Sequence, residues 1–357
     1  MNPTSNRLPW LDWMRGIGAL IMLQGHVFHS FMRNDLRESG PYLISQFVGG
    51  MPPALFLFLL GVTFSFLMDS QTRKGVSPAG RVKASVKRSG YLFAVAFAFR
   101  LQLWIVSMDK SPWTDLFRVD ILNIMGFSLL LLAPMAAYRT SERIRLCAIL
   151  GTAIALATPV ISGIDWSGVP PFIRYYLIPD KLNFGIFPWA SFVAFGLSAG
   201  SVLRSLKPDE TGQAMSWFGW GGMVLAFSSW AISNMHLTVY SNADFWFNSP
   251  ALIFIKLGVL LMMMAFAWVW NLGLEPGKWS LVRQFGTTSL LVYWVHVELV
   301  YGRALWFFKE NLSTAPTVVM AVLVILLMLG LSLLRTNRAQ VRVWWAARNP
   351  DRTFTTP

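Results

Sequence analysis

MRGIGALIMLQGH, residues 14–26, places an arginine and a histidine in one apolar segment with helical character. A charged side chain deep in a bilayer costs a few kcal/mol or more, so such residues are rare there and usually face a cavity or a partner. Arg15 and His26 are eleven positions apart, close to three helical turns, so both side chains lie on one face about 16 Å apart along the axis. The segment therefore predicts a membrane helix that lines a shaft, with Arg15 near its mouth and His26 deeper.

Each of these two residues also has a structural explanation. Asp12 precedes Arg15 by one turn, so a local ion pair is the alternative for the arginine. A hydrogen bond to a neighbouring helix is the alternative for His26, and the small residues between the two predict close helix packing more than ligand contact. His29 follows His26 by one turn and is expected near the outer interface.

The apolar character extends over the whole chain. Of 357 residues, 55% are hydrophobic and 13% charged, whereas a soluble domain has about 25% charged residues. Runs of about 20 apolar residues, enough to cross a hydrocarbon core of ~30 Å as a helix, recur from one end to the other. The expected spans are residues 10–32, 46–68, 89–107, 120–138, 145–162, 185–203, 214–233, 250–272, 284–306 and 314–334. The sequence predicts an all-α polytopic membrane protein with about ten transmembrane helices, in which residues 1–338 form a single membrane domain and residues 339–357 a basic tail.

The distribution of lysine and arginine predicts the orientation of these helices. If both termini are cytoplasmic, nineteen of the 30 lysines and arginines fall in inside segments, eight fall outside and three lie within spans. An excess of these residues in cytoplasmic loops is typical of membrane proteins. Both termini are therefore expected on the cytoplasmic side.

The same distribution limits the partners and cofactors. The net charge of +13 is spread over short loops, which favours contact with membrane lipids over nucleic acid. The single cysteine, Cys147, excludes an internal disulfide, and with only four histidines no metal site is expected. An arginine interrupts the first span and no cleavage site follows it, so a signal peptide is not expected. With no organelle-targeting segment visible, the inner (plasma) membrane of a bacterium is the predicted location. The sequence allows either a monomer or a homodimer.

Four stretches resemble the transmembrane acyltransferase superfamily. The arrangement of Arg15, ten residues and His26 is similar to the first helix of the acyltransferase 3 proteins. FRVDILNIMGFSLLLLAP (117–134) and FPWASFVAFGLSAG (187–200) resemble helices of the heparan-alpha-glucosaminide N-acetyltransferase-like proteins. SLLVYWVHVEL (289–299) is similar to a late helix with tyrosine and histidine in both groups. The resemblance implies a membrane enzyme that moves an acyl group, commonly acetyl from cytoplasmic acetyl-CoA, to an extracytoplasmic carbohydrate or glycan.

Acyl transfer needs a base that accepts a proton from the attacking hydroxyl or amine. Histidine suits this role near neutral pH, and His26 is the first candidate, either as a general base or as a transient acyl carrier. Arg15 is the candidate for binding the phosphates of CoA. On the predicted ninth span, Tyr293 and His296 share one face and are further catalytic candidates, with a tie between helices as the alternative for His296.

The remaining candidates lie elsewhere along the chain. Arg100 and Asp120 are expected to pair across the bundle, because buried charges are normally paired. The loop RKGVSPAGRVKASVKRSG (73–90) is expected to contact anionic lipid headgroups, and its Lys87 and Arg88 could share in binding CoA. The candidates for contact with the acceptor are His29, Asp120, Asn123 and Arg303. A transporter or flippase that uses the intramembrane charges as a substrate or proton path is the alternative function.

Overall fold

The computed structural model describes residues 8–106, 112–178, 184–235, 240, 243–274 and 278–338. These residues form helices joined by turns, with no β-sheet among them. The chain divides into two compact units, the first formed by Met1–Gly50 with Glu275–Pro357 and the second by Met51–Leu274. The predicted all-α class is confirmed. The predicted tail lies outside the described residues, and the predicted division of the chain at residue 338 stays a prediction.

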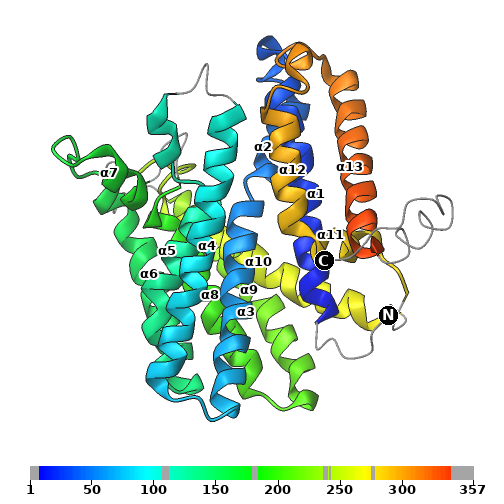
Figure 1. Cartoon of the computed structure of the whole chain (residues 1–357). Coiled ribbons are helices and arrows are strands. Elements are labelled where there is room, and N and C mark those ends of the chain that lie inside the picture. Colours follow the sequence, from blue (N-terminus) through cyan, green and yellow to red (C-terminus); the bar gives the residue numbers. More distant parts are fainter. Residues whose placement is uncertain are drawn as a thin grey trace, which may run out of the picture. The chain divides into compact units, whose positions relative to one another are not determined.

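The first unit joins the two ends of the sequence. Its helices are α1 (Pro9–Phe31), α2 (Gly40–Gly49), α11 (Leu281–Thr287), α12 (Ser289–Tyr301) and α13 (Thr314–Thr336). Helix α1 packs against all four others, and Figure 1 shows α12 in orange and α13 in red running alongside it. A proline at the start of α1 suits the first turn, where its missing N–H would have no helical partner.

Glycine permits the closest helix contact in this unit. A Cβ on Gly16 of α1 would lie 1.8 Å from the carbonyl oxygen of Val282 in α11. Reciprocally, a Cβ on Gly286 of α11 would lie 1.7 Å from the carbonyl oxygen of Asp12 in α1. The two backbones therefore touch directly, and the predicted packing role is confirmed for Gly16.

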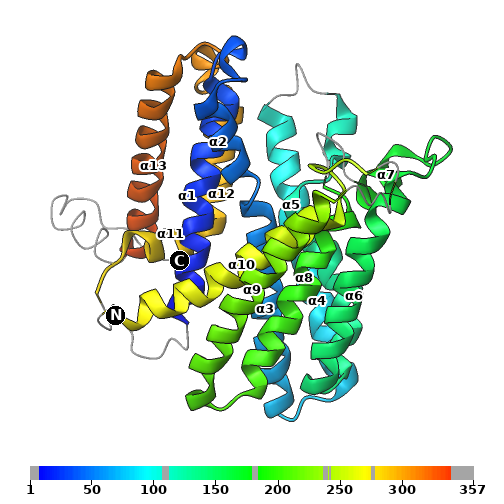
Figure 2. The ribbon, with the colours of Figure 1, turned by 180° about the vertical axis from the view of Figure 1, so that it is seen from behind.

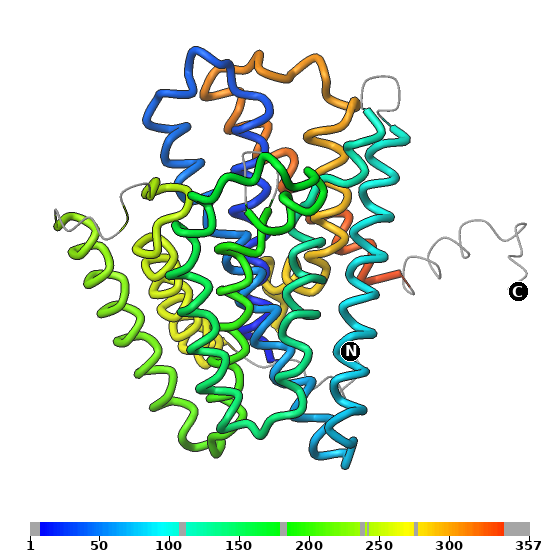
Figure 3. Tube along the Cα trace, turned by 90° about the vertical axis from the view of Figure 1, so that its left-hand side faces the viewer, coloured from blue at the N-terminus to red at the C-terminus, as the bar shows by residue number. Residues whose placement is uncertain are grey.

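The second unit contains the helices in the middle of the chain. They are α3 (Pro52–Arg73), α4 (Pro78–Val106), α5 (Ile121–Leu132), α6 (Thr140–Ser162), α7 (Pro171–Leu177), α8 (Ile186–Ser205), α9 (Thr211–Ser233) and α10 (Pro250–Leu272). Helix α8 packs against both α3 and α6, and it is buried over most of its length. Helices α9 and α10 pack against each other, as Figures 2 and 3 show in light green and yellow.

The helices agree closely with the predicted spans. Among the described residues, six helical segments are long and apolar enough to cross a membrane: Gly40–Arg73, Pro78–Val106, Thr140–Ser162, Ile186–Ser205, Pro250–Leu272 and Thr314–Thr336. The other four predicted spans correspond to α1, to the short apolar helices Ile121–Ala137 and Ser289–Tyr301, and to α9. Helices α1 and α9 each have 23 residues, which is about 35 Å of helix.

The largest differences from the predicted bounds are at α3, α4 and the ninth span. Helix α4 starts at Pro78, eleven residues before the predicted start at residue 89. Helix α3 starts at Pro52 rather than near residue 46, because two successive prolines cannot donate backbone hydrogen bonds to a preceding turn. The predicted ninth span is broken at Thr288, whose φ of −123° and ψ of 18° are not helical, and it ends at Tyr301 rather than residue 306. The short helix α7 was not predicted. The orientation of the helices in the membrane stays a prediction.

Candidate active site

Helices α1 and α12 bring together two histidines that are 270 positions apart in the sequence. Nδ1 of His26 lies 2.9 Å from Nε2 of His296, and the two rings stack with centroids 5.1 Å apart and an interplanar angle of 20°. His296 is fully buried, whereas His26 is partly exposed. His296 therefore supports His26 from the protein interior.

The hydrogen bonds of this pair define which ring nitrogen carries a proton. Nδ1 of His296 lies 2.8 Å from the carbonyl oxygen of Val292, one turn earlier in α12. Since a carbonyl oxygen only accepts, Nδ1 of His296 donates to it, and in the neutral ring Nε2 of His296 is then an acceptor. Nδ1 of His26 therefore donates to His296, which leaves the lone pair on Nε2 of His26. Nε2 is the nitrogen that can accept a proton.

Two tyrosines pack against the histidine pair. The ring of Tyr301 meets His26 edge to face, with centroids 5.2 Å apart, and Tyr293 meets His296 in the same manner at 5.9 Å. Tyr293 was predicted at this site, whereas Tyr301 was not. The contact of Tyr301 depends on the register between α1 and α12, and nothing in the local sequence indicates it.

The segment after α12 holds Tyr301 against the end of α1. Nζ of Lys309 donates to the carbonyl oxygen of Tyr301 at 2.6 Å, and partial burial lowers the pKa of this lysine below its usual value. The backbone N–H groups of Asn311 and Leu312 donate to the carbonyl oxygen of Phe31, at 3.1 and 2.9 Å. The hydroxyl of Tyr301 lies 3.4 Å from Nδ1 of the exposed His29. His29 is thus brought to the edge of the site.

Arg15 lies toward the other end of α1 and is paired locally. Its Nη1 donates to Oδ1 of Asp12 at 2.9 Å, and about a quarter of its side chain, 27%, is exposed. The ion pair that the sequence offered as the alternative is therefore present. The predicted role of Arg15 in binding the phosphates of CoA stays a prediction. Arg303 is exposed just beyond the end of α12.

The remaining predicted site residues belong to the second unit. Lys87 and Arg88 are exposed on α4. Asp120 caps the start of α5, where its Oδ1 accepts from the backbone N–H groups of residues 122 and 123, at 2.9 and 3.2 Å. Asn123 completes this capping box through its Oδ1, and its Nδ2 donates to the hydroxyl of Tyr176 at 3.2 Å. The side chain of Asn123 thus has structural contacts at both ends.

Arg100 and Asp120 approach each other as predicted. Nε of Arg100 lies 3.3 Å from Oδ2 of Asp120, and both side chains are largely buried. Neither of these two atoms has a hydrogen-bond partner among the described residues, so the contact is an ion pair without a well-directed hydrogen bond.

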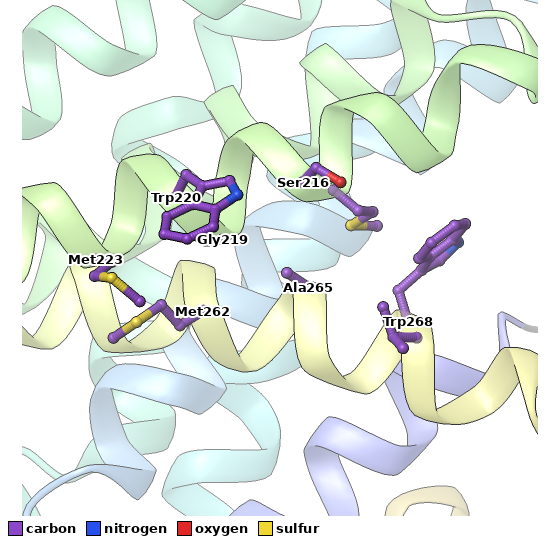
Figure 4. Close-up of a pocket in the computed structure, with 9 residues that line it drawn as sticks. Ser216, Gly219, Trp220, Met223, Met262, Ala265 and Trp268 are labelled. Carbon is purple, nitrogen blue, oxygen red and sulfur yellow. The ribbon is translucent and has the colours of Figure 1, made fainter.

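Two hollows among the described residues are largely apolar. A groove of about 310 Å³ between α9 and α10 is lined by methionine and tryptophan side chains, with Ser216 as its hydroxyl group (Figure 4). Its lining residues have no titratable side chain and cannot serve as acid or base. A second hollow of about 540 Å³ lies between α12 and α13, with leucines, Trp294 and two arginines in its lining. No group of three or more potential metal ligands occurs among the described residues.

Comparison with known families agrees with the resemblance in the sequence. The family described as heparan-alpha-glucosaminide N-acetyltransferase, catalytic, matches residues 7–241, which is more than half of the chain. The chain belongs to this family. No curated protein sequence matches the chain. The N-acetyltransferase match includes His26 and Arg15 and ends before His296. The hydrogen bond between the two histidines is therefore seen only in the structure.

Proposed function

We propose that this protein transfers an acetyl group from acetyl-CoA on the cytoplasmic side to a carbohydrate acceptor on the opposite side of a bacterial inner membrane. Membership of a membrane N-acetyltransferase family supports the reaction class. The observation that carries the proposal further is the hydrogen-bonded pair of His26 and His296 in two apolar helices. Buried histidines can serve as polar contacts between helices, but a pair that leaves a lone pair on Nε2 of the partly exposed His26 also supplies a base.

In the proposed reaction Nε2 of His26 is the atom that accepts the proton. The acceptor hydroxyl or amine loses its proton to Nε2 as its oxygen or nitrogen bonds to the thioester carbonyl carbon. The carbon–sulfur bond then breaks, and the leaving CoA thiolate takes up the proton from Nε2 of His26, which regenerates the base. A positioned base of this kind contributes about 10²–10⁴-fold to a rate. A neutral His296 fixes the tautomer of His26 and accepts its Nδ1 hydrogen bond while positive charge develops on that ring.

A covalent route uses the same nitrogen. Nε2 of His26 would attack the thioester carbon, expel the CoA thiolate and carry the acetyl group until the acceptor displaces it. Both routes require the same tautomer, so the histidine pair supports each equally. Incubation with acetyl-CoA without acceptor, followed by acid quenching and mass spectrometry, separates them, because only the covalent route leaves an acetyl group on His26.

We assign the donor and acceptor contacts to the polar and charged residues that the sequence singled out. Arg15 would bind the phosphates of CoA by charge-assisted hydrogen bonds, with Lys87 and Arg88 as further contacts. On the acceptor side the candidates are His29 and Arg303, together with Asp120 and Asn123 at the start of α5. These assignments rest on residue chemistry, and for Lys87, Arg88, His29 and Arg303 also on exposure.

The test uses the purified protein in nanodiscs with acetyl-CoA labelled in the acetyl group and a panel of soluble sugars and amino sugars. We expect labelled product with the wild type and a loss of at least about 100-fold with His26→Gln. Binding of CoA by this variant should be retained, which shows that the protein is folded.

A wild-type rate in His26→Gln would contradict the proposed mechanism. If the folded wild type binds neither acetyl-CoA nor CoA, the donor is a different compound or the protein is a transporter. In that case, uptake or exchange of solutes by proteoliposomes is the next measurement.

A further inference from the structure

The second unit contains an arginine cluster that the proposed mechanism does not use. Three of its members, Arg73 in α3, Arg143 in α6 and Arg204 in α8, approach the carboxylate of Asp69. The fourth, Arg81 in α4, donates to Thr72, the neighbour of Arg73, and is close enough to Arg143 for their charges to interact. These residues lie at the end of α3, the start of α4, the start of α6 and the end of α8. All four ends are on the side predicted to be cytoplasmic.

Asp69 compensates only part of this charge. Nε of Arg204 donates to its Oδ2 at 3.0 Å, and the hydroxyl of Thr140 donates to its Oδ1 at 3.1 Å. Nη2 of Arg73 and Nη2 of Arg143 lie 3.8 and 3.9 Å from the carboxylate, beyond hydrogen-bond distance. Four guanidinium groups and one carboxylate leave the cluster with an excess of three positive charges.

The two most buried members have only neutral hydrogen-bond partners. Arg81, which is 7% exposed, donates to the hydroxyl of Thr72 and the carbonyl oxygen of Ala137. Its Nε is buried and has no partner among the described residues. Arg143, which is 1% exposed, donates to the hydroxyl groups of Thr140 and Ser201. Burial of unbalanced charge is costly, so a further anion would complete the site.

We propose that this arginine cluster binds a phosphate group. A guanidinium presents its N–H donors in a planar fork that matches phosphate oxygens, and several such groups together favour a multiply charged anion. Two sources of phosphate reach a cytoplasmic membrane surface, the nucleotide part of acyl-CoA and the headgroup of an anionic phospholipid. The nucleotide source rests on the proposed function, whereas the lipid source does not.

The alternative is that the cluster only ties α3, α4, α6 and α8 together. The two explanations differ in the effect of Asp69→Asn, which removes the single negative charge. A phosphate site should bind its anion more tightly after this change, by about tenfold, because repulsion from the carboxylate is lost. A cluster that only ties helices should lose stability and gain no affinity for anions.

The experiment compares variants in nanodiscs of neutral phosphatidylcholine. Calorimetric titration with CoA and with inorganic pyrophosphate measures the affinity for the nucleotide phosphates. A thermal-shift series with increasing phosphatidylglycerol measures stabilisation by the anionic lipid headgroup. Arg81→Gln keeps a donor for Thr72 and removes the charge. Arg145→Gln, at an exposed arginine of α6 two residues from Arg143, is the control with the same loss of charge.

We expect Arg81→Gln to weaken binding by at least about tenfold and Arg145→Gln to leave it within about twofold. Loss of CoA and pyrophosphate binding identifies the nucleotide, and loss of stabilisation by phosphatidylglycerol identifies the lipid. If Arg81→Gln binds both ligands like the wild type and Asp69→Asn gains no affinity, the proposal is overturned. Acetyl transfer that persists in that case would show that the proposed function stands without this site.

Discussion

At the scale of single residues, the key property of the site is which ring nitrogen of His26 and of His296 carries the proton. The carbonyl oxygen of Val292 fixes the proton on Nδ1 of His296, and His296 in turn fixes the proton on Nδ1 of His26. In hydrolases with a catalytic triad, a buried hydrogen-bond acceptor orients the catalytic imidazole in the same way. Here the acceptor is a second neutral imidazole, so no charged group needs to be buried beside His26.

Replacement of His296 tests this orientation. In His296→Phe the ring volume is kept and the acceptor for His26 is lost, so we expect kcat to fall by about 100-fold, the cost typical of a misplaced catalytic group. The KM for acetyl-CoA should change little. Steady-state kinetics in nanodiscs measures both quantities, and an unchanged kcat would show that His26 needs no partner for its orientation.

Replacement of Tyr301 tests the edge-to-face contact. Tyr301→Phe keeps the ring that packs on His26 and loses only the long contact of 3.4 Å to His29, so we expect activity within about threefold of the wild type. Tyr301→Ala removes the ring that packs against the imidazole of His26, so the imidazole can move, and kcat should fall by about tenfold or more. Equal loss in both variants would instead assign a role to the hydroxyl.

At the scale of helices, the site depends on the close contact between α1 and α11. Gly16 and Gly286 let the two backbones touch, and α1 packs on α12 in the same unit. The position of His26 relative to His296 therefore follows from helix packing as well as from the hydrogen bond between them. Small residues at a helix interface serve this purpose in membrane proteins.

A methyl group at Gly286 should separate these helices. Its Cβ would lie 1.7 Å from the carbonyl oxygen of Asp12, a backbone atom that cannot move by itself. We expect Gly286→Ala to lower the free energy of unfolding by about 1–3 kcal/mol or more and to reduce acetyl transfer. Gly330→Ala in α13 is the matched control, since nothing lies within 4 Å of its Cβ.

The comparison can be made by unfolding in mixed detergent micelles. The control variant should be as stable as the wild type or slightly more stable, because alanine favours a helix over glycine by about 1 kcal/mol. Equal stability of the two variants would mean that α11 can shift away from α1 without cost.

At the scale of the whole molecule, the proposed function depends on the orientation of the helices in the membrane. The excess of lysine and arginine in alternate loops predicts that the α3–α4 turn is cytoplasmic and the segment after α6 is outside. The proposed direction of acetyl transfer depends on this prediction. It also places the arginine cluster on the side where CoA is found.

Single cysteines can measure this orientation. The native Cys147 is fully buried, so its background labelling should be low. We expect Gly168→Cys to react with a membrane-impermeant maleimide in intact cells and Lys74→Cys to react only after the membrane is opened. Both positions are exposed. The reverse pattern would invert the proposed sidedness of donor and acceptor.

The sequence by itself determined the helical membrane class, the approximate limits of the spans and the family. These follow from local properties, namely the length of apolar runs, helix-starting prolines and motifs within single helices. It also indicated His26, His296 and Tyr293 one by one, because polar residues in apolar helices are rare. Only the tertiary structure decided that Nδ1 of His26 meets Nε2 of His296, that Tyr301 packs on His26 and that three arginines from three helices approach Asp69. Such contacts depend on the register and rotation of helices far apart in the chain, which are fixed by packing between them and not by the periodicity of any one segment.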